Sequence, residues 1–119
     1  MSGFLRRQQD IEYSPVDAAD GLEKGVLVGT DDGTNVALRR FTLAGGGSVP
    51  EHTNAIEHDQ YVLDGGYVVG IGDTEHHVAT GDSIHIPAGT VHWYRNESDR
   101  EAAFLCAVPA GDDTIRLVE

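Results

Sequence analysis

The sequence has one cysteine, one lysine and no long apolar run, and each shortage excludes a class of protein. Cys106 by itself forms neither an internal disulfide nor a cysteine-based zinc site. No apolar run approaches the roughly 20 residues that cross a bilayer, so we expect no contact with a membrane. The opening stretch MSGFLRRQQD has no apolar segment after it and lacks the pattern of a secretory signal, which predicts a cytoplasmic location.

Basic residues are scarce, with 8 Lys and Arg against 20 Asp and Glu and a net charge of −12. Because phosphate binding depends on clustered Lys and Arg, nucleic acid is not an expected partner. The many aspartates beside a single lysine, Lys24, resemble the proteins of organisms that keep molar salt in their cytoplasm, so we expect a halophilic protein. The alternative is an acidic surface that serves solubility alone. At 1 M salt the Debye length falls to about 3 Å, and ligand recognition would then depend on direct contacts.

The 119 residues suit one domain, and the apolar residues fall in short β-type runs between turn-forming stretches. The runs are GVLVGT, VALRRFTL, QYVLDGGYVVGIGD, HHVATGDSIHIP, TVHWYRN and AAFLCAVP; the turn-forming stretches are DDGTN, AGGGSVPEH, LDGG, ATGD and PAG. Many short strands in one small domain predict an all-β sandwich or closed barrel. We expect residues 1–22 to form an N-terminal arm or edge strand, residues 23–119 to form the barrel domain, and GDDTIRLVE to add an edge strand.

His52 and His58 lie in the stretch PEHTNAIEHDQYVLDGG, and their spacing sets a condition for sharing one metal ion. On a straight strand, six steps of about 3.3 Å would separate them by roughly 20 Å, whereas a metal–imidazole bond is about 2.1 Å. On a helix, a spacing of six places them on different faces. Both therefore reach one ion only if the chain bends between them, for which TNAIE is the expected place, and a third ligand must come from a distant strand.

The stretch GDSIHIPAGTVHWYRN places Gly81, Pro87, Gly89, His92 and Asn96 at the spacings of the complete second motif of the cupin family. The first motif is matched by Gly47, His52, Asn54, His58 and Gly65. Asn54 stands where a second histidine is usual, and His58 where a glutamate is usual. Over residues 24–109 the chain resembles the cupin family, in particular small single-domain cupins with an all-histidine metal site, which implies a single-domain cupin β-barrel of the jelly-roll type, or double-stranded β-helix.

The resemblance implies that His52, His58 and His92 bind a divalent transition metal ion. Asn54 occupies a ligand position, but its amide oxygen is a weaker ligand than imidazole. A second spacing that the motif permits would put Asp59 in place of His58; we prefer His58 because the family places this ligand three residues before the aromatic residue, here Tyr61. Mn, Fe, Zn, Ni and Cu all accept imidazole, so the sequence does not identify the metal.

Strand alternation supplies candidates for substrate contact. Gln60 and Tyr94 lie two residues beyond His58 and His92 and share their faces. We add Phe104 and Cys106 on a late strand as substrate-binding candidates, with a small buried hydrophobe as the other reading of the cysteine. The remaining histidines, His76, His77 and His85, are expected at the surface.

Functions from three classes are open, and we favour an enzyme: a metal-dependent oxygenase, or an isomerase or hydrolase that uses the ion as a Lewis acid, acting on a small organic substrate. The alternatives are a non-catalytic cupin that binds or senses a small molecule and a structural cupin with an empty site, which Asn54 favours. No general base is evident, since Glu57 and Asp59 are expected to point outward. Small cupins usually pair through an edge strand or an exchanged arm, so the resemblance also implies a homodimer.

Overall fold

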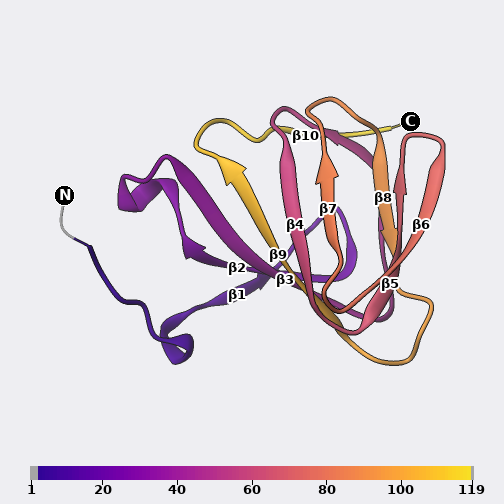
Figure 1. The fold of residues 1–119 in the computed structure, drawn as a ribbon, viewed down its shortest axis with the longest axis horizontal. Helices are drawn as coiled ribbons and strands as arrows, with labels where there is room; N and C mark the ends of the chain where they lie inside the picture. The colour runs from indigo at the N-terminus through magenta and orange to yellow at the C-terminus, as the bar shows by residue number, and fades with distance from the viewer. Residues whose placement is uncertain (1–2, 119) are drawn as a thin grey trace.

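The computed structural model describes residues 3–118, which form a single antiparallel sheet and two short 3-10 helices (Figure 1). The strands are β1 (Tyr13–Pro15), β2 (Asp20–Val28), β3 (Val36–Asn54), β4 (His58–Asp64), β5 (Gly66–Ile71), β6 (Thr74–Ala79), β7 (Ser83–Ile86), β8 (His92–Arg95), β9 (Ala102–Pro109) and β10 (Ile115–Leu117). The 3-10 helices are η1 (Gln8–Asp10) and η2 (Thr30–Asp32). No helix among residues 3–118 is long and apolar enough to cross a membrane.

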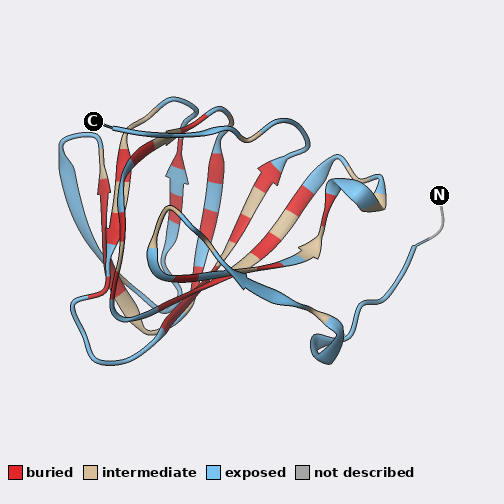
Figure 2. Cartoon of the chain, turned by 180° about the vertical axis from the view of Figure 1, so that it is seen from behind, coloured by how far each residue is buried: buried red, intermediate tan, exposed pale blue. Residues whose placement is uncertain are grey.

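The sheet has the strand order β6-β5-β8-β3-β9-β4-β7, with β2 and β10 also paired to β3 and β1 paired to β2. It curls so that most strands turn one face toward the interior, and Figure 2 shows buried and exposed segments alternating along them, whereas β1, β6 and β10 have no buried residue. Neighbours far apart in sequence, such as β3 and β9, are joined directly. This confirms the predicted all-β barrel.

Strand alternation decides which side chains face the interior. In β4, His58, Gln60 and Val62 are buried while the residues between them are more exposed. In β8, His92 and Tyr94 are buried in the same way. Because every second residue points inward, the motif histidines and their partners two residues on enter one interior.

Aromatic rings form the centre of the core. Phe104 stacks on Phe41 and on Tyr94, with ring centroids 5.2 and 5.6 Å apart, and contacts Tyr67 at 5.4 Å. Burying each such side chain contributes about 1.5–3 kcal/mol, so this cluster is a main source of stability. Phe41 and Phe104 of this cluster line the interior cavity beside Tyr94 and form an apolar part of its wall.

The stretch AGGGSVPEH was predicted to form a turn, and that prediction is wrong, because β3 continues through it. The strand pairs with β9 over residues 36–43 and with β8 from Ser48 to His52. At the glycines, Gly46 N–H donates to Asn96 O and Asn96 N–H donates to Gly47 O, both at 2.9 Å. These two bonds to Asn96, directly after β8, hold the chain in place, and Gly46 permits a bend with a φ of +77°.

The first and last strands, β1 and β10, pair with different strands of the sheet: β1 with β2, and β10 with β3. Near the N-terminus, β1 pairs with β2, and Arg6 forms an ion pair with Asp32 at 3.0 Å. Strand β2 begins at Asp20, so the predicted division at residues 22/23 falls inside this strand. At the other end, β10 confirms the predicted edge strand. The homodimer stays a prediction; the exposed side chains of Phe4 and Leu5 are available for such a contact.

Gly45 tests the close approach of backbones at this bend. A Cβ at Gly45 would lie 2.5 Å from the carbonyl carbon of Asp99, so we expect Gly45→Ala to lower the free energy of unfolding by about 1–3 kcal/mol. Gly3→Ala is the control, because a Cβ there meets nothing within 4 Å, and it should change stability by less than about 0.5 kcal/mol. Urea unfolding measures both; equal stabilities of the two variants would contradict the packing described here.

Candidate functional site

A cavity of about 80 Å³ lies inside the barrel. Seven of the eight predicted site residues line it: His52, Asn54, His58, Gln60, His92, Tyr94 and Phe104. The eighth, Cys106, is fully buried behind the wall and contacts His58 and Gln60. The cavity has room for several water molecules, or for an ion with a small organic group.

Three strands and one bend bring the histidines together. His52 near the end of β3 is the register partner of His92 on β8, and their ring centroids are 4.1 Å apart. The chain bends at residues 55–57 before β4 begins at His58, as the spacing argument required. The ring of His58 lies 6.2 Å from that of His92. Pairing of distant strands therefore places three imidazoles around one cavity.

His52 and His92 share an arrangement that suits metal ligands. Nδ1 of His52 donates to the carbonyl oxygen of Pro50 at 2.8 Å, and Nδ1 of His92 donates to that of Thr90 at 2.9 Å. A carbonyl only accepts, so each Nδ1 carries the proton and each Nε2 holds a free lone pair. Burial lowers the pKa of His52 and lowers that of His92 to about 4. Both rings are therefore neutral and able to donate electrons to a cation.

The cavity wall presents acceptors without donors. Among residues 3–118, six buried side-chain polar atoms have no hydrogen-bond partner. Four of them are acceptors on cavity-lining residues: Asn54 Oδ1, Gln60 Oε1, His92 Nε2 and Asp113 Oδ1. Each unpaired buried polar atom costs about 1–3 kcal/mol, and the donor Arg39 Nε on the same wall is also unpaired. This concentration in one place points to bound partners that supply hydrogen-bond donors or positive charge. Nitrogen and oxygen donors suit a divalent transition metal ion by type. Within residues 3–118, however, the group of three His, Cys, Asp or Glu ligand atoms that lie within 4.8 Å of one another is Glu57, Asp59 and His85, outside this cavity.

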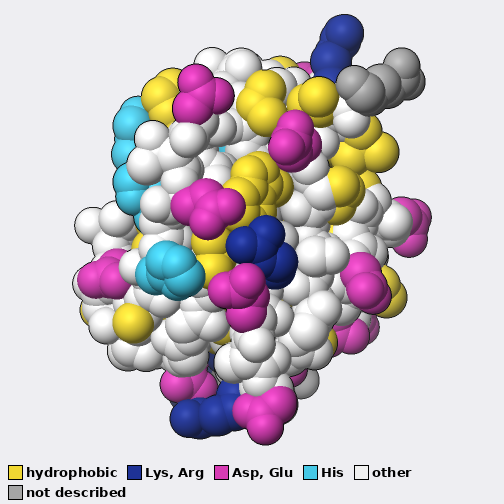
Figure 3. Space-filling model, turned by 90° about the vertical axis from the view of Figure 1, so that its right-hand side faces the viewer, with side chains coloured by type: hydrophobic (Ala, Val, Ile, Leu, Met, Phe, Trp, Pro, Cys, Tyr) yellow, Lys and Arg dark blue, Asp and Glu magenta, His cyan; other side chains and the backbone are white. Residues whose placement is uncertain are grey.

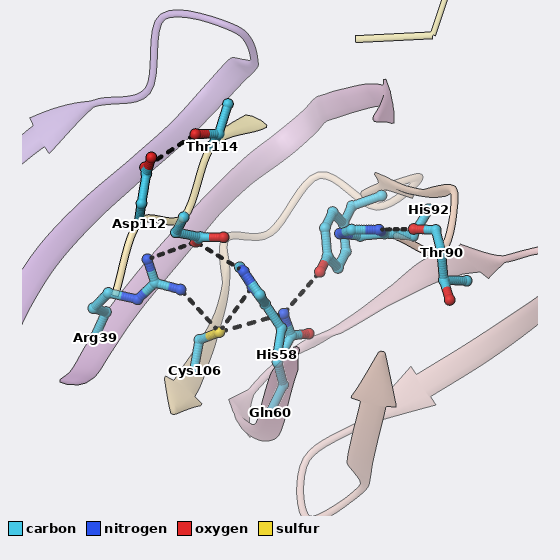
Figure 4. A network of polar contacts seen from close by, with 10 residues as sticks. Arg39, His58, Gln60, Thr90, His92, Cys106, Asp112 and Thr114 are labelled. Carbon is cyan, nitrogen blue, oxygen red and sulfur yellow. Dashed lines mark hydrogen bonds and ion pairs between the residues drawn. The ribbon is translucent and has the colours of Figure 1, made fainter. Parts of the chain in front are cut away.

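His58 differs from the other two histidines because both of its ring nitrogens are engaged (Figure 4). Nε2 lies 2.9 Å from Oδ2 of Asp113, and Nδ1 lies 3.3 Å from Sγ of Cys106. Burial opposes the charged ring, yet the hydrogen bonds to Asp113 and Cys106 raise the pKa of His58 to about 9. In this conformation His58 offers no free lone pair to an ion, so its role as a ligand stays a prediction.

Arg39 extends this network from β3. Its guanidinium donates to Sγ of Cys106 at 3.3 Å and lies 3.6 Å from Oδ2 of Asp113. Burial alone would raise the pKa of the Cys106 thiol, but contacts with His58 and Arg39 hold it below the ordinary value. Figure 4 shows Arg39 and His58 on either side of the Cys106 sulfur. The cysteine is therefore part of a polar network, in addition to filling space in the core.

Sequence reasoning missed Asp113. The residue lies in the stretch GDDT, outside both motifs, and no spacing marks it as different from the neighbouring Asp112. It reaches the cavity because β10 pairs with the end of β3, with Leu117 opposite His52. That pairing joins the end of the chain to a strand some 60 residues earlier, and local patterns carry no information about it.

Gln60 and Tyr94 form a second polar pair in the wall. Nε2 of Gln60 donates to the hydroxyl oxygen of Tyr94 at 2.7 Å. Burial raises the pKa of Tyr94, so its hydroxyl keeps its proton. Since the oxygen is already an acceptor, the proton of Tyr94 remains available to a ligand in the cavity. The two residues thus meet the geometric requirement for the predicted substrate contacts.

The outer surface carries the remaining histidines. His76, His77 and His85 are exposed, as predicted. Glu57, Asp59 and His85 place three potential ligand atoms within 4.8 Å of one another, but all three side chains are exposed on the outer face. Because Asp59 points away from the cavity, the structure favours His58 over Asp59 as the inward residue of the first motif. On the face drawn in Figure 3, acidic side chains stand separately among other residues.

Comparisons with known proteins agree with this architecture. The family model described as "Cupin domain" matches residues 39–108. The polyketide cyclase RemF from Streptomyces resistomycificus has 27% sequence identity and a TM-score of 0.88, covering 100% of this chain and 87% of its own. No curated protein matches the sequence.

Two further solved structures share the fold. A cupin-2 domain from Rhodospirillum rubrum has 24% identity and a TM-score of 0.83, covering 100% of this chain and 82% of its own. A cupin 2 conserved barrel domain protein from Rhodopseudomonas palustris also has 24% identity and a TM-score of 0.83, with coverages of 92% and 78%. At this level of identity the likeness concerns the fold alone.

Two buried asparagines provide a test of the unpaired acceptors. Asn54 Oδ1 has no donor, so Asn54→Leu should raise the free energy of unfolding of metal-free protein by about 1 kcal/mol. Asn96 is the matched control, because its side chain bonds to the carbonyl oxygens of Leu43 and Arg100 and to Ser98. Asn96→Leu should lower stability by about 2–4 kcal/mol. Thermal unfolding in chelator measures both, and an equal loss in the two variants would refute the assignment of Asn54.

Proposed function

Because the chain belongs to the cupin domain family, we propose that it is a metal-dependent enzyme acting on a small, carbonyl-bearing organic substrate inside its barrel. The observation that carries the proposal is the set of buried acceptors around one cavity, with two neutral imidazoles among the residues that line it. A structural cupin gains nothing from these unpaired groups, since apolar side chains would fill the same space at lower cost. The unpaired acceptors are explained if a bound cation and its organic ligand supply their missing partners.

The residues that would hold the ion come from β3 and β8. His52 and His92 would bind through Nε2, and Asn54 would add its amide oxygen. His58, the fourth predicted ligand, would join them only by releasing Asp113. A bound divalent ion supplies Lewis acidity, which polarises a substrate carbonyl and stabilises an enolate. Mn, Fe, Zn, Ni and Cu remain compatible with these donors.

The likeness to a polyketide cyclase supports a reaction without net oxidation, such as an isomerisation or a cyclisation of a β-dicarbonyl compound. The wall has groups for such chemistry. Tyr94 can donate its proton to a carbonyl oxygen, and the pair formed by His58 and Asp113 can hold a proton near the substrate. Phe104 and the other aromatic rings exclude water from one side. Of the reaction classes expected from the sequence, we therefore prefer the isomerase to the oxygenase.

The cavity lining favours a small and partly apolar substrate. Val16, Ile115 and Leu117 contribute apolar walls, and the single lysine, Lys24, also lines the cavity. In a chain with a net charge of −12, a lysine and Arg39 beside the cavity give an anionic group its best place to bind. A small β-keto acid combines these properties.

Metal content is the first test. Protein purified without chelator should hold about one divalent ion per chain, and His92→Ala should lose nearly all of it because the most enclosed imidazole ligand is gone. His77→Ala is the matched control, since this histidine is exposed on β6. Elemental analysis measures the metal content per chain of the wild type and the two variants, before and after metal reloading. A wild-type protein as empty as His92→Ala would refute the metalloenzyme.

Reaction class is tested with acetoacetate as the probe. Deuterium exchange at its C2 position, followed by NMR, should run about 10²-fold faster with metal-loaded wild type than with metal-free protein. Tyr94→Phe should lower the rate by about 10²-fold if its hydroxyl stabilises the developing enolate. Oxygen uptake should stay at background. Uptake without exchange would indicate an oxygenase, and binding without either would indicate a non-catalytic module.

A further inference from the structure

Arg39 places a buried positive charge in the wall of the cavity, with its side chain 10% exposed. Among residues 3–118 its guanidinium forms one hydrogen bond, from Nη2 to Sγ of Cys106 at 3.3 Å. Nη1 lies 3.6 Å from Oδ2 of Asp113, which is too long for a hydrogen bond, and Nε is buried without a partner. Since a guanidinium has five N–H donors, most of them lack an acceptor within the described chain.

Arg6 shows how a fully paired arginine is arranged in this chain. It lies at the surface, yet its guanidinium donates to both carboxylate oxygens of Asp32, at 3.0 and 3.2 Å, and to the carbonyl oxygen of Leu27. Unpaired donors cost more stability in a buried group, where solvent does not replace the missing acceptor. The single hydrogen bond of the buried Arg39 therefore indicates that its missing acceptor is a bound molecule.

Lys24 adds a second positive charge to the same part of the wall. It lies on β2 opposite Phe41 of β3, and Arg39 lies two residues before Phe41 on the same face of the strand. The centre of the Arg39 guanidinium is 5.3 Å from the Phe41 ring. Lys24 is half-buried and lines the cavity, and within residues 3–118 it forms no ion pair. Two cations therefore lie beside one aromatic ring of the cavity.

The charges that line the cavity do not cancel. Lys24 and Arg39 contribute two positive charges and Asp113 contributes one negative charge, so one positive charge is in excess even when the histidines are counted as neutral. This excess lies inside a chain whose net charge is −12. Because a buried charge without a counterion is costly, the cavity favours a ligand that carries one negative charge.

We propose that the guanidinium of Arg39, together with the ammonium group of Lys24, binds the carboxylate of the substrate and selects a small monocarboxylate over a neutral carbonyl compound. A guanidinium matches the planar shape of a carboxylate and donates parallel hydrogen bonds to it. The inference rests on the proposed function for the class of substrate, because it concerns the same cavity, but this contact needs no metal ion.

The other polar atoms of the wall set the orientation of such a ligand. Arg39 belongs to the first part of β3, which pairs with β9. The unpaired acceptors of Asn54 and His92 belong to the last residue of β3 and to β8. The carboxylate then lies toward Arg39 and the enolisable end of the ligand toward Asn54 and His92, where the hydroxyl of an enol finds an acceptor.

Acetoacetate and acetoacetamide are the probes, because they have nearly the same shape and differ by one negative charge. Their binding to chelator-treated full-length protein is measured by ligand-observed NMR titration at one fixed salt concentration. We expect the wild type to bind acetoacetate at least about 10-fold more tightly than acetoacetamide. Arg39→Gln should weaken acetoacetate binding by about 10²-fold and Lys24→Gln by about 10-fold, while acetoacetamide binding changes by less than about 3-fold.

Arg40→Gln is the matched control, because Arg40 is the next residue of β3 and is not among the residues that line the cavity. It should match the wild type with both probes. Arg39→Lys keeps the charge without the planar fork and should recover part of the preference for acetoacetate. Circular dichroism verifies that each variant is folded, and Lys24→Gln takes the place of Arg39→Gln as the decisive variant if the latter does not fold.

The results separate this inference from the proposed function. Loss of the preference for acetoacetate in the decisive variant, with Arg40→Gln unchanged, supports the inference. Equal binding of the two probes by the wild type, or a preference that persists in the decisive variant, overturns it and leaves the proposed function in place. Binding to metal-loaded protein alone also overturns it, because the ion then holds the carboxylate. A wild type that binds neither probe, with or without metal, overturns both.

Discussion

The candidate site depends on the antiparallel pairing of β3 with β8, which sets His52 opposite His92. Strand β3 is long enough to serve both halves of the barrel: its first part pairs with β2 and β9, and its last part pairs with β8 and β10. Glycines at the bend let the backbone pass between these partners, with a register shift in the pairing to β2 between Leu43 and Ser48. Strand β3 itself carries His52 and Asn54, and its pairing with β8 sets the position of His92.

The cavity wall is energetically unfavourable by itself, and the surrounding core supports it. Aromatic stacking around Phe104 and the satisfied hydrogen bonds of Asn96 stabilise the barrel next to acceptors that have no donors. A local loss of stability of this kind is common at binding sites, because polar groups that are placed to contact a ligand cannot also form hydrogen bonds with one another. The side-chain oxygen of Asn54 has no hydrogen-bond partner, whereas the side chain of Asn96 is hydrogen-bonded to its neighbours.

Charge is arranged differently inside and outside the barrel. The chain has a net charge of −12, yet among residues 3–118 one carboxylate alone lines the cavity, and His58 and Arg39 lie against one of its oxygens. The outer acidic cluster around His85 has its hydrogen bonds at the solvent-exposed surface. An interior with neutral imidazoles and one oriented carboxylate suits chemistry in which charge develops on the substrate.

Local patterns in the sequence determined the β class, the inward residues of β4 and β8, and the bend between His52 and His58, because alternation and turn chemistry act over a few residues. Motif spacing identified four of the residues that line the cavity, strand alternation added Gln60 and Tyr94, and the position of a late strand added Phe104. Tertiary structure alone decided that β3 continues through its glycines, that both nitrogens of His58 are engaged, and that Asp113 enters the site. Each of these depends on strands paired across tens of residues, and such pairing is set by packing of the whole barrel.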